Sequence, residues 1–258
     1  MIRPQRFIFS GIIFFIIGLA LIVGGMLLPA RNAVAGAGVL YAAPTAQGSG
    51  DCLSWANACT LQSALGMAAS GNEIWVASGV HYPGSAQADT FALKSGVAIY
   101  GGFNGDETSR DERDWEAFPT ILSGDIDHND IDPEGNFIIE DYAQIQVNNT
   151  YHVVTGNGAD TTAILDGFII TAGQANAGGW PGNYGGGIFS DGGSPTLSNL
   201  LFSGNYANTG GGAMLNSQAT IALTQVIFSG NYAGDAGGAI YDHHVNLTLV
   251  DVTFDSNR

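Results

Sequence analysis

The segment FSGNYANTGGGAML, residues 202–215, returns as FSGNYAGDAGGAIY at residues 228–241, and the pattern starts again with FDSN at residues 254–257. The copies are 26 residues apart, and they combine glycine turns with β-branched and aromatic residues. A fixed period of this length without a helical pattern predicts a solenoid with one coil per repeat. We therefore expect an all-β protein, a right-handed parallel β-helix with coils of about 26 residues.

Equivalent residues of stacked coils should lie directly above one another, because neighbouring strands are about 4.8 Å apart. The repeat then predicts an internal stack of phenylalanines and a ladder of asparagine amides, each bonded to the next. These six positions are Phe202, Phe228 and Phe254 in the stack and Asn205, Asn231 and Asn257 in the ladder. A structural role explains the motif, and a ligand-binding role for the asparagines is the alternative.

Residues 1–35 have the features of an export signal. Arg3 and Arg6 precede an uncharged apolar run at residues 7–28, and an A-x-A cleavage pattern follows at residues 33–35. The run is also long enough to span a bilayer, so a cleaved signal peptide and an uncleaved N-terminal membrane anchor both remain open. In either case we expect the remaining chain to be exported.

Residues 36–90 are predicted to form a linker and capping region. Thr60 is a candidate N-cap for a short helix that would cover the open end of the solenoid. Cys52 and Cys59 are expected to form a disulfide, because exported chains are oxidised and the two residues are close in sequence. We assign residues 91–258 to the β-helix and expect it to be truncated at its C-terminus, because the sequence stops inside a repeat.

The charge distribution excludes some partners. The net charge is −16, with 7 Lys and Arg against 23 Asp and Glu, which argues against nucleic-acid binding. No Lys or Arg lies between Trp115 and Asn257. The coils therefore offer no cationic group for a β-elimination reaction on an acidic sugar.

Two features are candidates for ligand binding. The stretch DIDHNDID at residues 125–132 spaces oxygen ligands as for a hard cation, although it lacks the central Gly and terminal Glu of a calcium loop. The predicted calcium ligands are Asp125, Asp127, Asn129, Asp130 and Asp132, and a solvated acidic loop is the alternative. Trp180, within GGWPGNYGG, is a candidate glycan contact, or it folds back onto the coil.

The glycine blocks GGGI, GGAM and GGAI, alternating with FSGN and FDSN, resemble the repeats of chlamydial polymorphic outer membrane proteins. The stretches IYGGFNGDET, ILSGDIDHND, YHVVTGNG and ILDGFIITAG are similar to bacterial right-handed β-helix surface proteins of the pectin-lyase-like superfamily. The resemblance begins at Asp51 and implies the fold. It also implies a secreted, cell-surface or outer-membrane location, with membrane attachment through the N-terminal segment or a C-terminal anchor outside this sequence.

This superfamily includes both adhesins and polysaccharide-cleaving enzymes, so the fold does not decide the function. We favour a non-catalytic adhesin, glycan-binding module or structural stalk, whose partner is a polysaccharide or a cell-surface glycan or protein. The alternative is a secreted polysaccharide-degrading enzyme. A glycoside hydrolase is favoured over a lyase, because paired carboxylates are available at residues 125–132 whereas cations are scarce.

Overall fold

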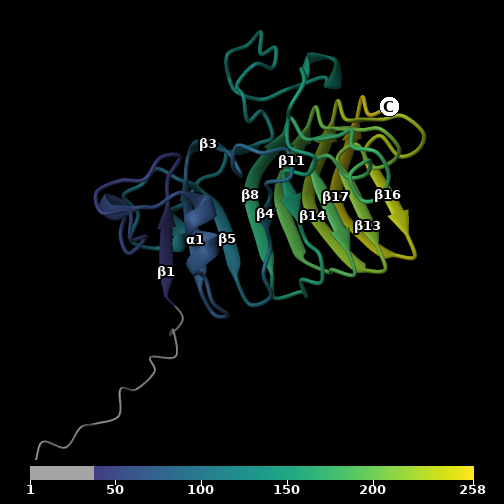
Figure 1. Ribbon diagram of the computed structural model, residues 1–258. Helices are drawn as coiled ribbons and strands as arrows, with labels where there is room; N and C mark the ends of the chain where they lie inside the picture. The colour runs from purple at the N-terminus through teal and green to yellow at the C-terminus, as the bar shows by residue number, and fades with distance from the viewer. Residues whose placement is uncertain (1–37) are drawn as a thin grey trace, which may run out of the picture. The chain divides into compact units, whose positions relative to one another are not determined.

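The computed structural model describes residues 38–258, whose regular secondary structure is mostly parallel strands joined by turns and loops (Figure 1). The signal-peptide or anchor prediction for residues 1–35 lies outside the described residues. Within residues 38–258 the helical elements are short. They are one α-helix, α1 (Leu61–Met67), and three 3-10 turns, η1 (Trp55–Asn57), η2 (Arg110–Glu112) and η3 (Tyr142–Gln144).

Three parallel sheets form the sides of the coils. The large sheet has the order β1-β2-β5-β8-β11-β14-β17, and β3 and β6 pair alongside it. Its strands are β1 (Val39–Ala42), β2 (Glu73–Ala77), β3 (Gly79–His81), β5 (Ala98–Phe103), β6 (Thr120–Ser123), β8 (Ile164–Thr171), β11 (Thr196–Ser203), β14 (Thr220–Ser229) and β17 (Asn246–Asp255).

The other two sheets are smaller. One contains β4 (Phe91–Ala92), β7 (Val154–Thr155), β10 (Ile188–Asp191), β13 (Met214–Ser217) and β16 (Ile240–His243), and the other contains β9 (Gln174–Ala175), β12 (Tyr206–Ala207) and β15 (Tyr232–Ala233). Strands one repeat apart pair in register, so that Phe202 lies beside Phe228 and Phe228 beside Phe254. The prediction of an all-β parallel β-helix is confirmed.

The large sheet begins at Val39, well before residue 91, where the sequence pattern placed the first coil. The first strands carry no F-x-x-N or glycine-block motif, so the period cannot reveal them. The free edge of β1 is closed by the segment that contains the predicted disulfide: Tyr41 N donates to Cys52 O (2.9 Å) and Ala43 N to Cys59 O (2.8 Å). The disulfide between Cys52 and Cys59 is confirmed.

Helix α1 covers the N-terminal end of the coils, where it packs against β1, β2 and β4. The Thr60 hydroxyl accepts a hydrogen bond from Ser63 N (3.3 Å), as its predicted N-cap role requires. Leu61, Ala64 and Leu65 face inward and join the main hydrophobic core. The helix therefore shields the apolar interior that the first coil would otherwise expose.

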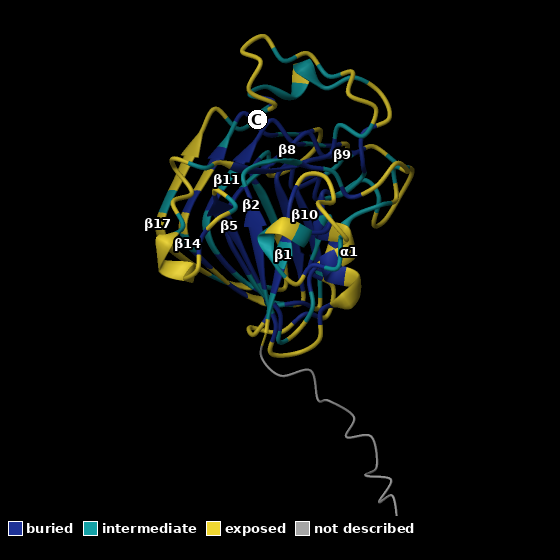
Figure 2. Cartoon of the chain, turned by 90° about the vertical axis from the view of Figure 1, so that its left-hand side faces the viewer, coloured by how far each residue is buried: buried dark blue, intermediate teal, exposed yellow. Residues whose placement is uncertain are grey.

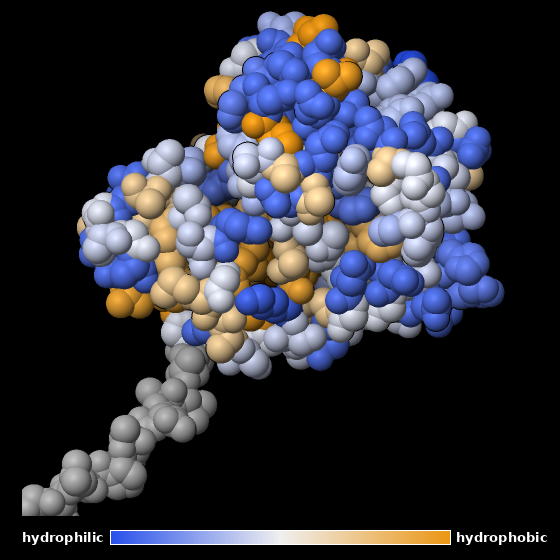
Figure 3. All heavy atoms as spheres, in the orientation of Figure 1, coloured by the Kyte–Doolittle hydropathy of each residue, from blue (hydrophilic) through white to orange (hydrophobic). Residues whose placement is uncertain are grey.

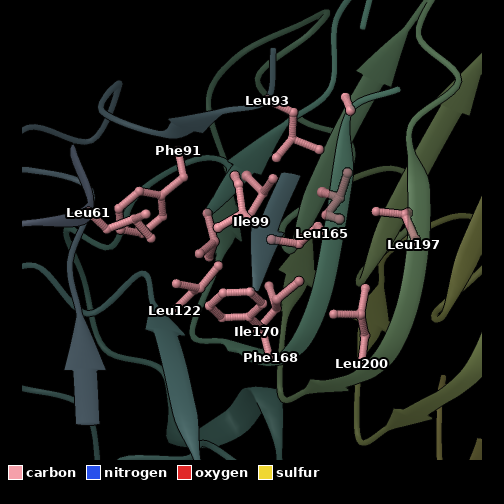
Figure 4. Close-up of a cluster of buried hydrophobic side chains, with 14 of the residues drawn as sticks. Leu61, Phe91, Leu93, Ile99, Leu122, Leu165, Phe168, Ile170, Leu197 and Leu200 are labelled. Atoms are coloured by element: carbon pink, nitrogen blue, oxygen red, sulfur yellow. The ribbon is translucent and has the colours of Figure 1, made fainter. Parts of the chain in front are cut away.

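The interior of the coils is a continuous apolar column (Figures 2 and 4). Leu165 and Leu197 are register partners in it, as are Phe168 and Leu200. The rings of Phe202 and Phe228 stack with centroids 4.8 Å apart, and those of Phe228 and Phe254 are 5.2 Å apart. Inward positions repeat in each coil, and each core side chain therefore packs on its equivalents above and below.

Asparagine amides bridge consecutive coils at one corner. Asn205 Nδ2 donates to Asn231 Oδ1 (3.0 Å), and Asn231 Nδ2 donates to Asn257 Oδ1 (2.8 Å). The backbone N–H of Asn205 also donates to Asn231 Oδ1 (3.0 Å), and Asn231 Nδ2 donates to Phe202 O (3.0 Å). Each buried amide thus satisfies the backbone of a neighbouring corner as well as the next amide.

Replacing Asn231 with Ala should destabilise the protein by about 3 kcal/mol or more, because the change leaves several buried donors and one carbonyl without partners. Urea unfolding followed by circular dichroism measures this loss. The matched control is Asn208→Ala in the same region, an exposed amide whose loss should cost under about 0.5 kcal/mol. An equal loss in the free energy of unfolding for the two variants would contradict a stabilising role of the buried amide ladder.

Candidate functional site: a groove on the outer face of the large sheet

A groove of about 550 Å³ lies on the outer face of the large sheet. Its floor is a row of outward side chains that are register partners in successive strands: Ile169 in β8, Leu201 in β11, Ile227 in β14 and Thr253 in β17. The row crosses the strands, so the groove follows the stacking direction of the coils. Ile227 is 47% exposed, which is unusual for a large apolar side chain in a sheet.

One rim of the groove is a parallel row of polar side chains. Asn199, Gln225 and Asp251 occupy equivalent positions in β11, β14 and β17, and all three line the groove. Each has a positive φ, between 51° and 55°, and each interrupts the pairing register of its strand. The backbone bends at these residues, which places hydrogen-bonding side chains beside the apolar floor.

A wall from the segment between β5 and β6 borders the groove at its β8 end, where a Cβ on Gly167, the β8 residue equivalent to Asn199, would be 3.4 Å from Trp115 Cβ. Trp115, Glu116 and Pro119 line the groove, and Trp115 is 38% exposed. Gly102 (φ +91°) allows this wall to lie directly on the sheet, because a Cβ there would be 2.7 Å from Trp115 Cα. The indole therefore sits at the edge of the apolar row.

Arg113 fixes this wall to the coils. Its Nη2 is 2.6 Å from Asp166 Oδ1, and both side chains are largely buried, with 12% and 13% exposure. Its guanidinium lies over the rings of Trp115 (4.9 Å) and Tyr100 (5.0 Å). Ser198 donates to the other oxygen of Asp166 (2.5 Å) and Asn199 Nδ2 donates to both oxygens (3.1 Å each), so this carboxylate is fully bonded.

A second hollow, of about 420 Å³, adjoins the groove through their shared wall residue, Trp115. Arg110 lines it and pairs with Glu73 (2.7 Å), and its guanidinium lies over the Tyr100 ring at 4.8 Å. The 104–119 segment folds back onto the large sheet, so both arginines lie against strands of that sheet. Both arginines are paired with carboxylates.

Three of the predicted calcium ligands, Asp125, Asp130 and Asp132, line one pocket, and Asp127 and Asn129 do not. Among residues 38–258, no three His, Cys, Asp or Glu side chains form a group that could hold a metal ion. Asp132 accepts from Gly135 N (2.8 Å) and Phe137 N (2.7 Å), and Asp127 accepts from the Asn129 amide (3.0 Å). These carboxylates stabilise turns of their own loop, and calcium binding by residues 125–132 stays a prediction.

Asp130 differs from its neighbours because it points inward, where it accepts from Gln146 N (2.6 Å) and Asn149 Nδ2 (2.6 Å). Burial raises the pKa of the Asp130 carboxyl to about 6, and the two hydrogen bonds only partly oppose this. It lines a pocket of about 220 Å³ together with Asp125 and Asp132.

Trp180 lies on the coil side. Its ring contacts Tyr184 (centroids 5.3 Å apart) and meets Phe189 edge to face (5.1 Å), yet the side chain remains 51% exposed. It borders none of the pockets described above. Trp180 therefore packs as an aromatic cover on β10 while keeping one face accessible.

Sequence reasoning missed Trp115 and Arg113. The available signal was the run RDERDW at residues 110–115, which holds two of the few cations of the chain next to an aromatic residue. Asp166 could not be paired with Arg113 in advance, because 53 residues and two non-repetitive insertions separate them.

Residues 225–242 match the family model described as the Chlamydia polymorphic membrane protein repeat. They run from β14 into β16 and contain the second FSGN and GGAI motifs. No curated protein and no solved structure matches the chain. The helices of residues 38–258 are all too short or too polar to span a bilayer.

We expect Arg113→Met to destabilise the protein by about 3 kcal/mol, because it leaves the Asp166 carboxylate buried without its cation. Arg110→Met is the control: its ion pair is solvent-exposed, so the loss should stay below about 1 kcal/mol. Chemical denaturation gives both values. Arg113→Met should also raise the quenching of tryptophan fluorescence by acrylamide, because Trp115 loses its packing partner. Similar free energies of unfolding for Arg113→Met and Arg110→Met would argue against a role of Arg113 in anchoring the 104–119 segment.

Proposed function

We propose that this chain is an exported, surface-displayed β-helix module that binds an extended, neutral glycan in the groove along the large sheet. The observation that carries the proposal is the floor row, which has three aliphatic side chains, Ile169, Leu201 and Ile227, and ends in Thr253; the polar row Asn199, Gln225 and Asp251 borders it. Ligand sites commonly combine an apolar surface with a few placed polar groups, and this groove has that composition.

The direction of the groove favours a linear polymer. Four register-aligned floor residues span three inter-strand intervals of about 4.8 Å each, or roughly 14 Å. The coils of β11, β14 and β17 each add the same two elements, one floor side chain and one rim side chain, whereas β8 adds a floor side chain and has Gly167 at the rim position. A polymer with a repeating unit would meet similar contacts at each step.

The chemistry of the groove favours a neutral sugar. Trp115 offers a half-exposed indole for the apolar face of a pyranose ring, and the amides of Asn199 and Gln225 can bond hydroxyl groups. The groove itself carries the carboxylates of Glu116 and Asp251, and Arg113 beside it is neutralised by Asp166. With a net charge of −16, the protein would repel an anionic polymer.

Export and surface display are supported by three features. The N-terminal apolar run has the pattern of an export signal, Cys52 and Cys59 form a disulfide, and residues 225–242 match a repeat of chlamydial membrane proteins. An adhesin or a glycan-binding stalk uses such a module to hold a polymer rather than to cleave it.

Trp115→Ala should weaken binding to a recognised neutral glycan at least 10-fold, because the stacking surface is lost. A glycan array finds the ligand, and isothermal titration calorimetry measures the change. Ile227→Ser, at a different point of the floor, should also weaken binding. Trp180→Ala is the matched control, a tryptophan outside the groove that is more exposed than Trp115 (51% against 38%), and it should change the Kd less than 2-fold.

Loss of binding in Trp180→Ala with none in Trp115→Ala would move the site to the β10 side of the coils. A panel of neutral polymers without any binding would contradict the proposal. Sustained release of new reducing ends from a polymer would instead favour the alternative, a polysaccharide hydrolase, since the groove contains the carboxylates of Glu116 and Asp251.

A further inference from the structure

The 124–153 segment between β6 and β7 is the teal loop above the coils in Figure 1, and the coil below it contains an unusual polar ring. The surface of this segment is mainly hydrophilic, with isolated hydrophobic side chains (Figure 3). At its base a ring of hydrogen bonds joins Asp130, Gln146, Gln174, Thr150 and Asn149.

The ring closes through four hydrogen bonds and the peptide bond between Asn149 and Thr150. Gln146 N donates to Asp130 Oδ1 (2.6 Å), and Gln174 Nε2 donates to Gln146 O (2.8 Å). Gln174 N donates to Thr150 O (2.8 Å), and the neighbouring Asn149 donates through Nδ2 to Asp130 Oδ2 (2.6 Å). Asn149 Nδ2 also bonds Ala172 O (2.8 Å), which fixes the orientation of its amide.

Three residues of the ring also carry a buried side-chain oxygen that takes no part in it and has no hydrogen-bond partner among the described residues. These oxygens are Asn149 Oδ1, Thr150 Oγ1 and Gln174 Oε1. Asn149 and Thr150 are both completely buried, at 0% exposure. A buried polar atom without a partner is costly, and three of them on residues of one ring, next to a carboxylate, are not explained by packing.

The identity of these atoms restricts what could satisfy them. The two amide oxygens can only accept, their own N–H groups are already used within the ring, and the Asp130 carboxylate is also an acceptor. A single water has two hydrogens and cannot serve all of these oxygens. A hard divalent cation bonds to oxygen ligands of this kind, namely a carboxylate, amide carbonyls and a hydroxyl.

We propose that Asp130, Asn149, Thr150 and Gln174 form a calcium site that holds the 124–153 segment onto the coils. Asp130 supplies the charge, and the three buried oxygens supply neutral ligands. This site differs from the loop motif of residues 125–132, because it uses only Asp130 from that motif and draws its other ligands from beyond the loop.

A pocket of about 220 Å³ reaches the proposed site at Asp130, and the other three proposed ligands do not line it. Asp130 lines it together with Asp125 and Asp132, so a cation would approach through a negative opening. Ca²⁺ accepts six to eight oxygens in flexible geometry, and water from this pocket can complete the set, whereas Mg²⁺ requires a near-octahedral arrangement. With one carboxylate, the site should have the millimolar affinity of extracellular calcium modules.

The test is the melting temperature of the purified protein in EDTA and in 0–20 mM CaCl₂, with ionic strength held constant by NaCl. We expect a rise of roughly 3–5 °C near 10 mM Ca²⁺, and a smaller rise with Mg²⁺. Asp130→Asn should lose most of this rise. Asp127→Asn, an exposed carboxylate of the same loop, should keep it.

Thr150→Val is the most informative variant. If Thr150 is a ligand, the variant loses most of the calcium-dependent rise, yet in EDTA its melting temperature equals or exceeds that of the original protein, because a buried unpartnered hydroxyl has been removed. This readout does not depend on Asp130→Asn folding normally.

Three results would overturn the proposal. The first is no response of the original protein up to 20 mM Ca²⁺, which would leave buried water as the occupant of the ring. The second is an unchanged calcium response in Thr150→Val. The third is an equal loss in Asp127→Asn and Asp130→Asn, which would assign calcium to the loop motif instead.

Discussion

The in-register stacking of coils is the constraint on which the rest of this structure depends. A buried corner of a parallel β-helix leaves backbone groups that neither sheet can pair, and Asn205, Asn231 and Asn257 satisfy them while bonding to one another. The amides fit only if consecutive coils align at the same corner. The coils from β11 to β14 and from β14 to β17 align with a step of 26 residues, and the coil from β8 to β11 aligns with a step of 32 because its turn is longer.

The same stacking generates the groove. Once Phe202 and Phe228 are aligned inside the coils, the residues that precede them, Leu201 and Ile227, must be aligned outside, because side chains alternate along a strand. The polar rim follows from the aligned bends at Asn199 and Gln225. A continuous binding surface therefore arises from the repeat itself, and a single substitution in one coil changes one step of the surface.

The parts that the sequence predicted are those governed by the period: the sheet class, the phenylalanine stack, the amide ladder and, from residue chemistry, the disulfide and the Thr60 cap. The period ended where the motifs ended, so β1 and β2 fell within the predicted linker and capping region of residues 36–90. Contacts made by insertions were invisible for a different reason. Arg113 meets Asp166 only after the 104–119 segment folds back, and no local pattern specifies that return. The spacing of the DIDHNDID stretch does not by itself separate a cation loop from turn capping, because aspartates spaced for a cation are equally suited to accept from turn N–H groups, as Asp132 does.

One comparison within the repeat shows how the insertions constrain the coils. Gly204, Gly230 and Ser256 occupy equivalent positions, and all three have a positive φ of 53° to 63°. A Cβ at Gly204 would collide with Ile139 O, and one at Gly230 with Glu140 O, both in the 124–153 segment. At the third position a Ser is tolerated and is exposed, so the backbone conformation alone does not require glycine. The glycines are required because the 124–153 segment packs on those two coils. The 124–153 segment therefore packs at a defined position on the coils. A ligand bound at its base would stabilise a contact for which Gly204 and Gly230 already leave room.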